Sequence, residues 1–107
     1  MKRGNIVICV VNKDYGKPRP ALIIQSDLFN PTHGSVVICP ITSACIDASL
    51  FRITLEPNKQ NGIKKLSQIM IDKMSAIQKT KIREKIGSLA KSETELINHA
   101  IRLWLNL

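Results

Sequence analysis

The chain has 107 residues, of which 44% are apolar and 22% are charged, so it has the size and composition of one folded domain and not of a disordered segment. Sixteen lysines and arginines stand against eight acidic residues, and the net charge of +8 favours polyanionic partners such as nucleic acid or an acidic protein segment. Only four aromatic side chains are present, and their scatter argues against a stacking platform for single-stranded nucleic acid.

The cysteines and histidines indicate neither a disulfide framework nor a metal site. Cys9 and Cys39 lie inside apolar runs, as small core residues do, and no Cys-x-x-Cys pair occurs. His33 and His99 lack the spacing of metal ligands. No stretch has the pattern of a signal peptide or a membrane span. We therefore expect a cytoplasmic protein with no metal or other cofactor and no membrane partner.

Four strands are predicted in the first half of the chain. Residues 6–11 form a continuous apolar run rich in β-branched side chains, which indicates a strand buried on both faces. Further strands are expected at residues 21–25, 35–41 and 51–55, with polar loops between them and one short helical turn between the second and third. Pro40 has no N–H to donate, so we expect it at a sheet edge or a bulge.

Residues 66–77 fit either a helix or a long bent strand. We favour a strand, because the turn signal Asn61-Gly62 precedes the segment and Asp72-Lys73 interrupts the helical stripe.

Two helices are expected after this segment. Residues 79–89 look like a short helix, and Ser92 with Glu95 forms a capping box for an amphipathic helix that carries Trp104 as a core or interface anchor. The order of elements predicts an α+β, mainly β fold: a small β-barrel or sheet with a C-terminal helix and short additional helices packed on it.

Arg19 is the first candidate for chemistry. It lies between Pro18 and Pro20, and a residue before proline is held extended, so a planar cation is presented at the start of a strand. Such a guanidinium suits a phosphate oxygen. The alternative interpretation is a solvated arginine between ordinary turn prolines.

Thr42 and Ser43 are a second candidate, at the end of the third strand. Two adjacent hydroxyls can donate to a phosphate or a developing oxyanion. The alternative is that they simply cap the following loop.

Six segments, taken in order, resemble the MazF/PemK family of type II toxin–antitoxin ribonucleases over nearly the whole chain. They are KRGNIV (residues 2–7), GKPRPALI (16–23), FN (29–30), VICPITS (37–43), SQIMIDK (67–73) and IGSL (86–89). Their order and spacing carry the resemblance, since no one segment is decisive. The resemblance implies one toxin domain over residues 1–107, an SH3-like barrel and a homodimer. It further implies metal-independent cleavage of single-stranded RNA by 2′-hydroxyl attack, and neutralisation by an antitoxin with a flexible acidic segment.

The resemblance also implies the site residues. The catalytic positions are Arg19 and Thr42 with Ser43, and Asp72 is a tentative base. The expected RNA-binding residues are Lys17, Asn30, His33, Gln68 and Lys73. The chain departs from the family at Met70 and Ser75, where relatives have arginines, and at Asn5, where an acid is usual. His33 is a second candidate base, or an ordinary loop histidine.

Two other functions stay open from the sequence. Gyrase-poisoning toxins of the same fold use residues at the extreme C-terminus, where this chain has Trp104, but they lack the Arg-Pro pair. The departures at Met70 and Ser75 leave room for a catalytically weak module that binds RNA or sequesters antitoxin.

Overall fold

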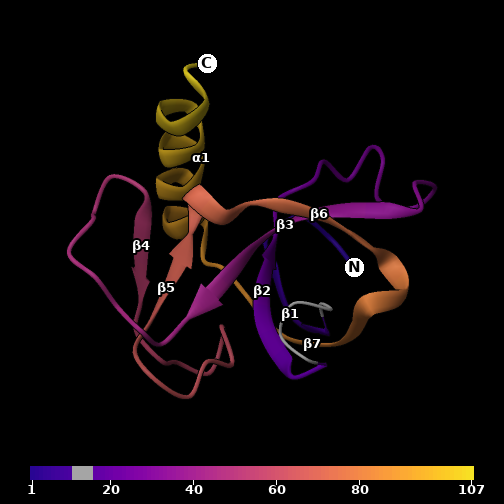
Figure 1. The fold of residues 1–107 in the computed structure, drawn as a ribbon, viewed down its shortest axis with the longest axis horizontal. Helices are drawn as coiled ribbons and strands as arrows, with labels where there is room; N and C mark the ends of the chain where they lie inside the picture. Colours follow the sequence, from indigo (N-terminus) through magenta and orange to yellow (C-terminus); the bar gives the residue numbers. More distant parts are fainter. Residues whose placement is uncertain (11–15) are drawn as a thin grey trace.

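The computed structural model describes residues 1–10 and 16–107 and shows a single antiparallel sheet with one α-helix against it (Figure 1). The sheet has seven strands in the order β4-β5-β3-β2-β1-β7, with β6 beside the first half of β3. The elements are β1 (Asn5–Val10), β2 (Pro18–Ile23), β3 (Ser35–Thr42), β4 (Arg52–Leu55), β5 (Ser67–Met70), the 3₁₀ turn η2 (Ile71–Lys73), β6 (Ser75–Gln78), the 3₁₀ turn η3 (Lys79–Lys81), β7 (Ile82–Ser88) and α1 (Lys91–Leu105). The outer strands β4 and β7 are not paired with each other, so the expected barrel is an open, curled sheet.

The middle of the sheet is buried on both faces, as the apolar run in residues 6–11 predicted, although Val11 lies outside the described residues. On one face, Ile6 and Leu22 pack with side chains of β5, η2 and α1. On the other face, Val7 and Ala21 pack with the first half of β3 and with Ile77 of β6. Two cores therefore enclose β1 and β2 and hold the strand that carries Arg19.

Pro40 lies inside β3, which has neighbours on both sides, so the expectation of an edge position is wrong. The Ile24 N–H donates to the Val37 carbonyl at 3.1 Å, and alternate residues of β3 bond to opposite neighbours, so the nitrogen of Pro40 faces away from β2. On that side, residues 35–38 pair with β6 and residues 41–42 pair with β5. Pro40 thus occupies the place where β3 changes partner and where no N–H is required.

The segment 66–77 is extended, as predicted, and it is divided into β5 and β6 by the turn η2. The prediction of a helix over residues 79–89 is wrong, because most of the segment is the strand β7. Its pairing with β1 shifts register twice, which leaves Arg83 and Ile86 as the extra residues of two bulges. The apolar Ile82 and Ile86 lie four residues apart in the sequence, a spacing that fits one face of a helix, but in the bulged strand they pack against different cores.

The helix α1 begins at Lys91, so the expected capping box of Ser92 and Glu95 is also wrong. The cap is Ala90, whose N–H donates to Oε1 of Glu93 at 2.8 Å. In Figure 1, α1 lies beside β4 and β5, and the Trp104 ring lies 5.4 Å from that of Phe51. Trp104 is 47% exposed, so it is not the expected core anchor, and its role as an interface anchor stays a prediction. No helix in the described part of the chain is long and apolar enough to cross a membrane.

The segment between β4 and β5 is held rigidly against β7. Asn61 is completely buried; its Oδ1 accepts from the N–H groups of Asn58 and Ile63, and its amide donates to the Glu56 carbonyl at 2.8 Å. Gly62 has φ +69°, and a Cβ there would lie 2.1 Å from the Ile86 carbonyl oxygen. The predicted Asn61-Gly62 turn is therefore also a close contact between two segments.

Candidate active site

An open groove of about 750 Å³ lies on the face of the sheet where β2, β3 and β7 approach the segment before β5. Its floor and walls are largely apolar, and its polar and charged side chains come from four segments. The residues that line it are Ile8, Arg19, Pro20, Pro40, Ile41, Thr42, Ser43, Ala44, Gly62, Ile63, Lys64, Lys65, Ser67, Met70, Glu84 and Ile86. The groove thus brings Arg19 together with Thr42 and Ser43, although the hydroxyl pair begins 23 residues further along the chain (42 − 19).

Arg19 belongs to β2, where its backbone pairs with Cys9 of β1, and it is an exposed residue that lines the groove. Within the described residues, no carboxylate forms an ion pair with it. Both neighbouring prolines are part of the strand, so the backbone on either side of Arg19 has little freedom. Because no described carboxylate neutralises it, the Arg19 guanidinium is available to an anionic ligand.

Thr42 performs the capping role that the sequence left open and still has a group to offer. Its Oγ1 accepts the Ala44 N–H at 3.0 Å, which fixes the first turn of the loop after β3. The hydroxyl hydrogen is not used in that bond, so it can be donated into the groove. Ser43 follows and is exposed. Thr42 can therefore cap the loop and still donate a hydrogen bond to a phosphate.

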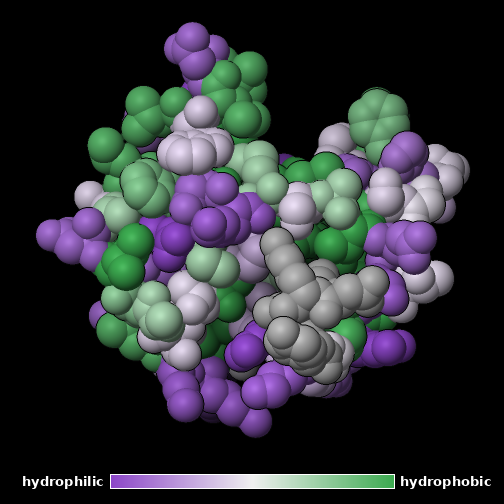
Figure 2. Space-filling model, in the orientation of Figure 1, coloured by the Kyte–Doolittle hydropathy of each residue, from purple (hydrophilic) through white to green (hydrophobic). Residues whose placement is uncertain are grey.

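Lys64 and Lys65 line the groove, and we did not single them out as site residues from the sequence. They follow the turn fixed by Asn61 and Gly62, which places their backbone against the groove. Figure 2 shows hydrophilic side chains along the lower edge of the molecule, over the segment between β4 and β5. Residues 59–85 are rich in lysine. The position of Lys64 and Lys65 beside the groove, however, depends on this turn.

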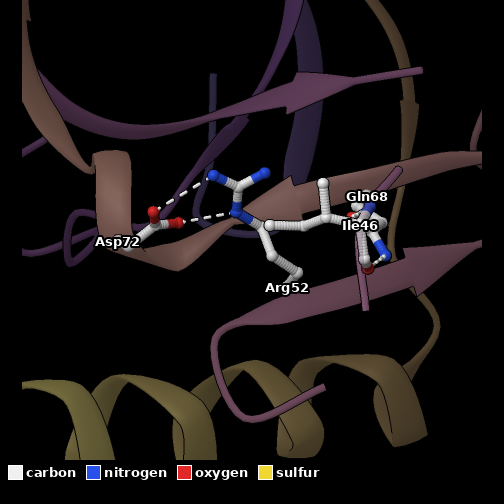
Figure 3. A network of polar contacts seen from close by, with 4 residues as sticks. All are labelled: Ile46, Arg52, Gln68 and Asp72. Carbon is white, nitrogen blue, oxygen red and sulfur yellow. Dashed lines mark hydrogen bonds and ion pairs between the residues drawn. The ribbon is translucent and has the colours of Figure 1, made fainter. Parts of the chain in front are cut away.

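Asp72, the tentative base, does not line the groove. Nε of Arg52 lies 2.8 Å from Oδ1 of Asp72, and Nη2 lies 3.1 Å from Oδ2, so a two-point ion pair joins β4 to η2 (Figure 3). Hydrogen bonding to Arg52 holds the pKa of Asp72 below its usual range, which makes this carboxylate a weaker base. Met70 of β5 pairs with Arg52 of β4. The chain thus has no arginine at position 70, and the arginine that contacts Asp72 comes from the neighbouring strand.

Two of the expected RNA-binding residues have their polar atoms engaged inside the protein. The Asn30 amide donates to the Gln25 carbonyl and to Asp27, and its Oδ1 accepts from Gln25. Gln68 forms two bonds with the backbone of Ile46, at 2.8 and 3.0 Å, and so braces the loop after Thr42 (Figure 3). Both side chains are buried and hydrogen-bonded within the protein, so the expectation that they bind RNA stays a prediction.

The other three expected RNA-binding residues, Lys17, His33 and Lys73, are exposed but do not line the groove. Lys17 immediately precedes β2 and lies two residues from Arg19, whereas His33 lies in the loop between β2 and β3. The structure therefore brings neither of the two proposed bases, Asp72 and His33, to Arg19. Within residues 1–10 and 16–107, no group of three or more His, Cys, Asp or Glu is placed to hold a metal ion.

Comparison with known proteins identifies the family. Residues 2–105 match the model of the "PemK-like, MazF-like toxin of type II toxin-antitoxin system". The chain belongs to the PemK/MazF toxin family. A probable endoribonuclease MazF of Mycolicibacterium smegmatis is 36% identical, over 100% of this chain and 98% of the relative. The endoribonuclease EndoA of Bacillus subtilis is 26% identical, over 100% of this chain and 96% of the relative.

Solved structures of PemK/MazF proteins share the fold. The toxin MazF-mt6 of Mycobacterium tuberculosis superposes with a TM-score of 0.83 at 23% identity, over 96% of this chain and 97% of that one. An endoribonuclease from a mycobacterial species, solved in complex with its cognate antitoxin, gives a TM-score of 0.85 at 18% identity, over 100% of this chain and 96% of that one. The fold class predicted from the sequence is thereby confirmed.

Proposed function

We propose that this chain is the toxin of a type II toxin–antitoxin pair and an endoribonuclease that cuts single-stranded RNA in the groove. The observation that carries the proposal is the meeting of Arg19 with Thr42 and Ser43 in one open groove, in a family whose curated relatives are named endoribonucleases. The chain's charge of +8 favours the same ligand.

In the proposed reaction, the 2′ oxygen of a ribose attacks the adjacent phosphorus, and the bond from phosphorus to the 5′ oxygen breaks. The 2′ hydroxyl gives up its proton and the departing 5′ oxygen gains one, so the products are a cyclic phosphate and a 5′-hydroxyl. Arg19 stabilises the charge that accumulates on the phosphate oxygens, and the hydroxyls of Thr42 and Ser43 donate to them. Arg19 does not act as acid or base, because a guanidinium holds its proton too tightly. The scheme requires no metal ion.

The same surface suits the partners that the family implies. A flexible acidic segment of an antitoxin would find Arg19, Lys64 and Lys65 on one groove, so antitoxin and RNA would compete for it. A homodimer is part of the proposal as well. Figure 2 shows apolar side chains gathered on the projecting part of α1, where Leu103 and Leu105 are about half exposed.

The test is to incubate a long RNA with the purified protein in EDTA and to map the cuts by primer extension. We expect discrete cuts that end in cyclic phosphate and 5′-hydroxyl groups. Arg19→Ala should slow cutting by about a hundredfold or more, by analogy with removal of an oxyanion donor. Arg83→Ala is the matched control, since Arg83 is exposed on β7 and does not line the groove.

Near-normal cutting by a folded Arg19→Ala protein would refute the proposed mechanism. Tight, salt-sensitive RNA binding without cuts would show a binding module in its place. DNA breaks that depend on gyrase would support the gyrase-poisoning alternative. In the structure, the Trp104 ring that this alternative invokes packs against Phe51.

A further inference from the structure

Glu84 is the one carboxylate among the described residues that line the groove. The other charged side chains there are Arg19, Lys64 and Lys65, and no ion pair joins Glu84 to any of them. A negative charge in a groove that binds a polyanion opposes binding. A carboxylate in this place therefore needs a favourable contact with the ligand that offsets the repulsion.

The backbone of β7 is built so that this carboxylate, and not the neighbouring ammonium group, faces the groove. Ile6 pairs with Gly87, and continued regular pairing would set Lys85 opposite Ile8. The bulge at Ile86 inserts one extra residue, so that Glu84 is opposite Ile8. Because Ile8 also pairs with Pro20, the side chains of Pro20, Ile8 and Glu84 form one row across three strands, and all three line the groove.

The row fixes how far Glu84 lies from Arg19. Two strand spacings of about 4.8 Å each separate β2 from β7, so roughly 10 Å lies between the backbones at Arg19 and Glu84. A separation of this size leaves room for two contacts to different parts of the ligand, with the phosphate at Arg19 and a base near Glu84.

The surroundings of Glu84 also suit a base. Ile8, Pro20 and Ile86 provide an apolar surface beside the carboxylate, on which the flat face of an unstacked base can rest. The base edge would then meet a group that only accepts hydrogen bonds. Guanine, cytosine and adenine each have an amino group on the Watson–Crick edge. Uracil has no amino group there. Its N3–H lies between two carbonyl oxygens, so a carboxylate that accepts from N3–H also lies close to both oxygens and is repelled by them.

We propose that Glu84 is a specificity-determining residue, which accepts a hydrogen bond from the amino group of one unstacked base near the cut and excludes uracil from that position. The proposal rests on the proposed function, since it assumes that RNA is cut in this groove. It assigns to Glu84 no part in proton transfer.

The experiment compares the unaltered protein with Glu84→Gln on an RNA pool that contains a randomised segment, and sequences the 5′-hydroxyl ends. The unaltered protein should exclude uracil at one position near the cut. A glutamine amide both accepts and donates, so Glu84→Gln should cut RNAs with uracil there at least about tenfold more often relative to the others, while the remaining positions keep their preference. Glu95→Gln, an exposed site on α1 away from the groove, removes the same charge and serves as the control.

The possible failures are distinguishable. An absence of cuts by the unaltered protein would overturn the proposed function and the role of Glu84 with it. Cuts whose sequence preference is the same in Glu84→Gln would overturn the role of Glu84 alone. A general loss of cutting by Glu84→Gln at all sequences, with a changed pH–rate profile, would also overturn it, because that result would identify Glu84 as the base. Glu84→Ala, measured in the same way, repeats the test with no side-chain polar group at all.

Discussion

Arg19 and Arg52 are both arginines on strands of one sheet, and their surroundings give them opposite roles. Arg52 is 10% exposed at its side chain and is held at two points by Asp72. Arg19 is exposed in the groove and has no carboxylate partner in the described part of the chain. The first guanidinium fastens β4 to η2, and the second is free for a ligand. A charged residue therefore indicates a site only when its own chain does not neutralise it.

The largest effect in this comparison should come from Arg52→Ala. The change leaves the half-buried carboxylate of Asp72 without its partner, so we expect the free energy of unfolding to fall by about 2 kcal/mol. Cutting by the folded protein should stay close to normal, which is the reverse of the result expected for Arg19→Ala. Urea unfolding measures the first quantity and initial cutting rates measure the second. If the Arg52→Ala protein were as stable as the unaltered protein but inactive, Arg52 would have a catalytic role and not the structural role assigned to it.

The acid response of the same ion pair sharpens the comparison. Arg52 lowers the pKa of Asp72, so the unfolded chain binds the proton more readily, and the stabilisation is present above the ordinary aspartate pKa of about 3.9. It is lost as pH falls through the lower folded value. The difference in unfolding free energy between the unaltered protein and Asp72→Asn should be large at pH 7 and small near pH 2. A difference that does not vary with pH would show that charge plays no part in the contact.

A smaller change is expected from Thr42→Val on the groove side. The substitution keeps the shape of the side chain but removes both the cap to the Ala44 N–H and the hydrogen that can be donated to phosphate. We expect cutting to slow by about tenfold, less than for Arg19→Ala, because Ser43 keeps a second hydroxyl in place. Single-turnover rates at saturating RNA measure the effect. Thr54→Val on β4, an exposed threonine outside the groove, is the control.

The smallest effect should come from Gln68→Ala, which removes the two bonds to Ile46. Stability should fall by about 1 kcal/mol, and KM for RNA should rise several-fold, because the loop after Thr42 loses its brace. Gln78→Ala, at an exposed site on β6, should change neither quantity. If Gln68 contacted RNA directly, as the sequence suggested, the variant would instead lose selectivity at one base.

The sequence predicted the elements that follow from local patterns. The two-sided burial of the first strand follows from its unbroken apolar run. Arg19 and Thr42 were candidates from their local sequence, and the resemblance to a family added the expectation that both are catalytic. The strand β7 was missed because the spacing of four residues between Ile82 and Ile86 also fits a helix. Its two bulges arise from pairing with a distant strand, which local patterns do not show.

The same limit explains the site residues that were missed or misplaced. Glu84 faces the groove only because of a bulge in β7, and Lys64 and Lys65 reach it through a turn that packs on that strand. Asp72 is occupied by Arg52, which is 20 residues away and opposite Met70 in the sheet. Each of these facts depends on a register between separate segments, and one sequence does not reveal that register.

The proline within β3 has a consequence for the shape of the whole molecule. Since residue 40 carries no amide hydrogen, neither β5 nor β6 can continue its ladder past that point, and the two strands diverge on either side of it. Pro40 itself is half-buried and lines the groove, next to the strand end that presents Thr42. An imino acid thus opens the cleft by ending two strand pairings at once, and Pro40→Val would favour a flatter, more continuous sheet with less room for a nucleotide.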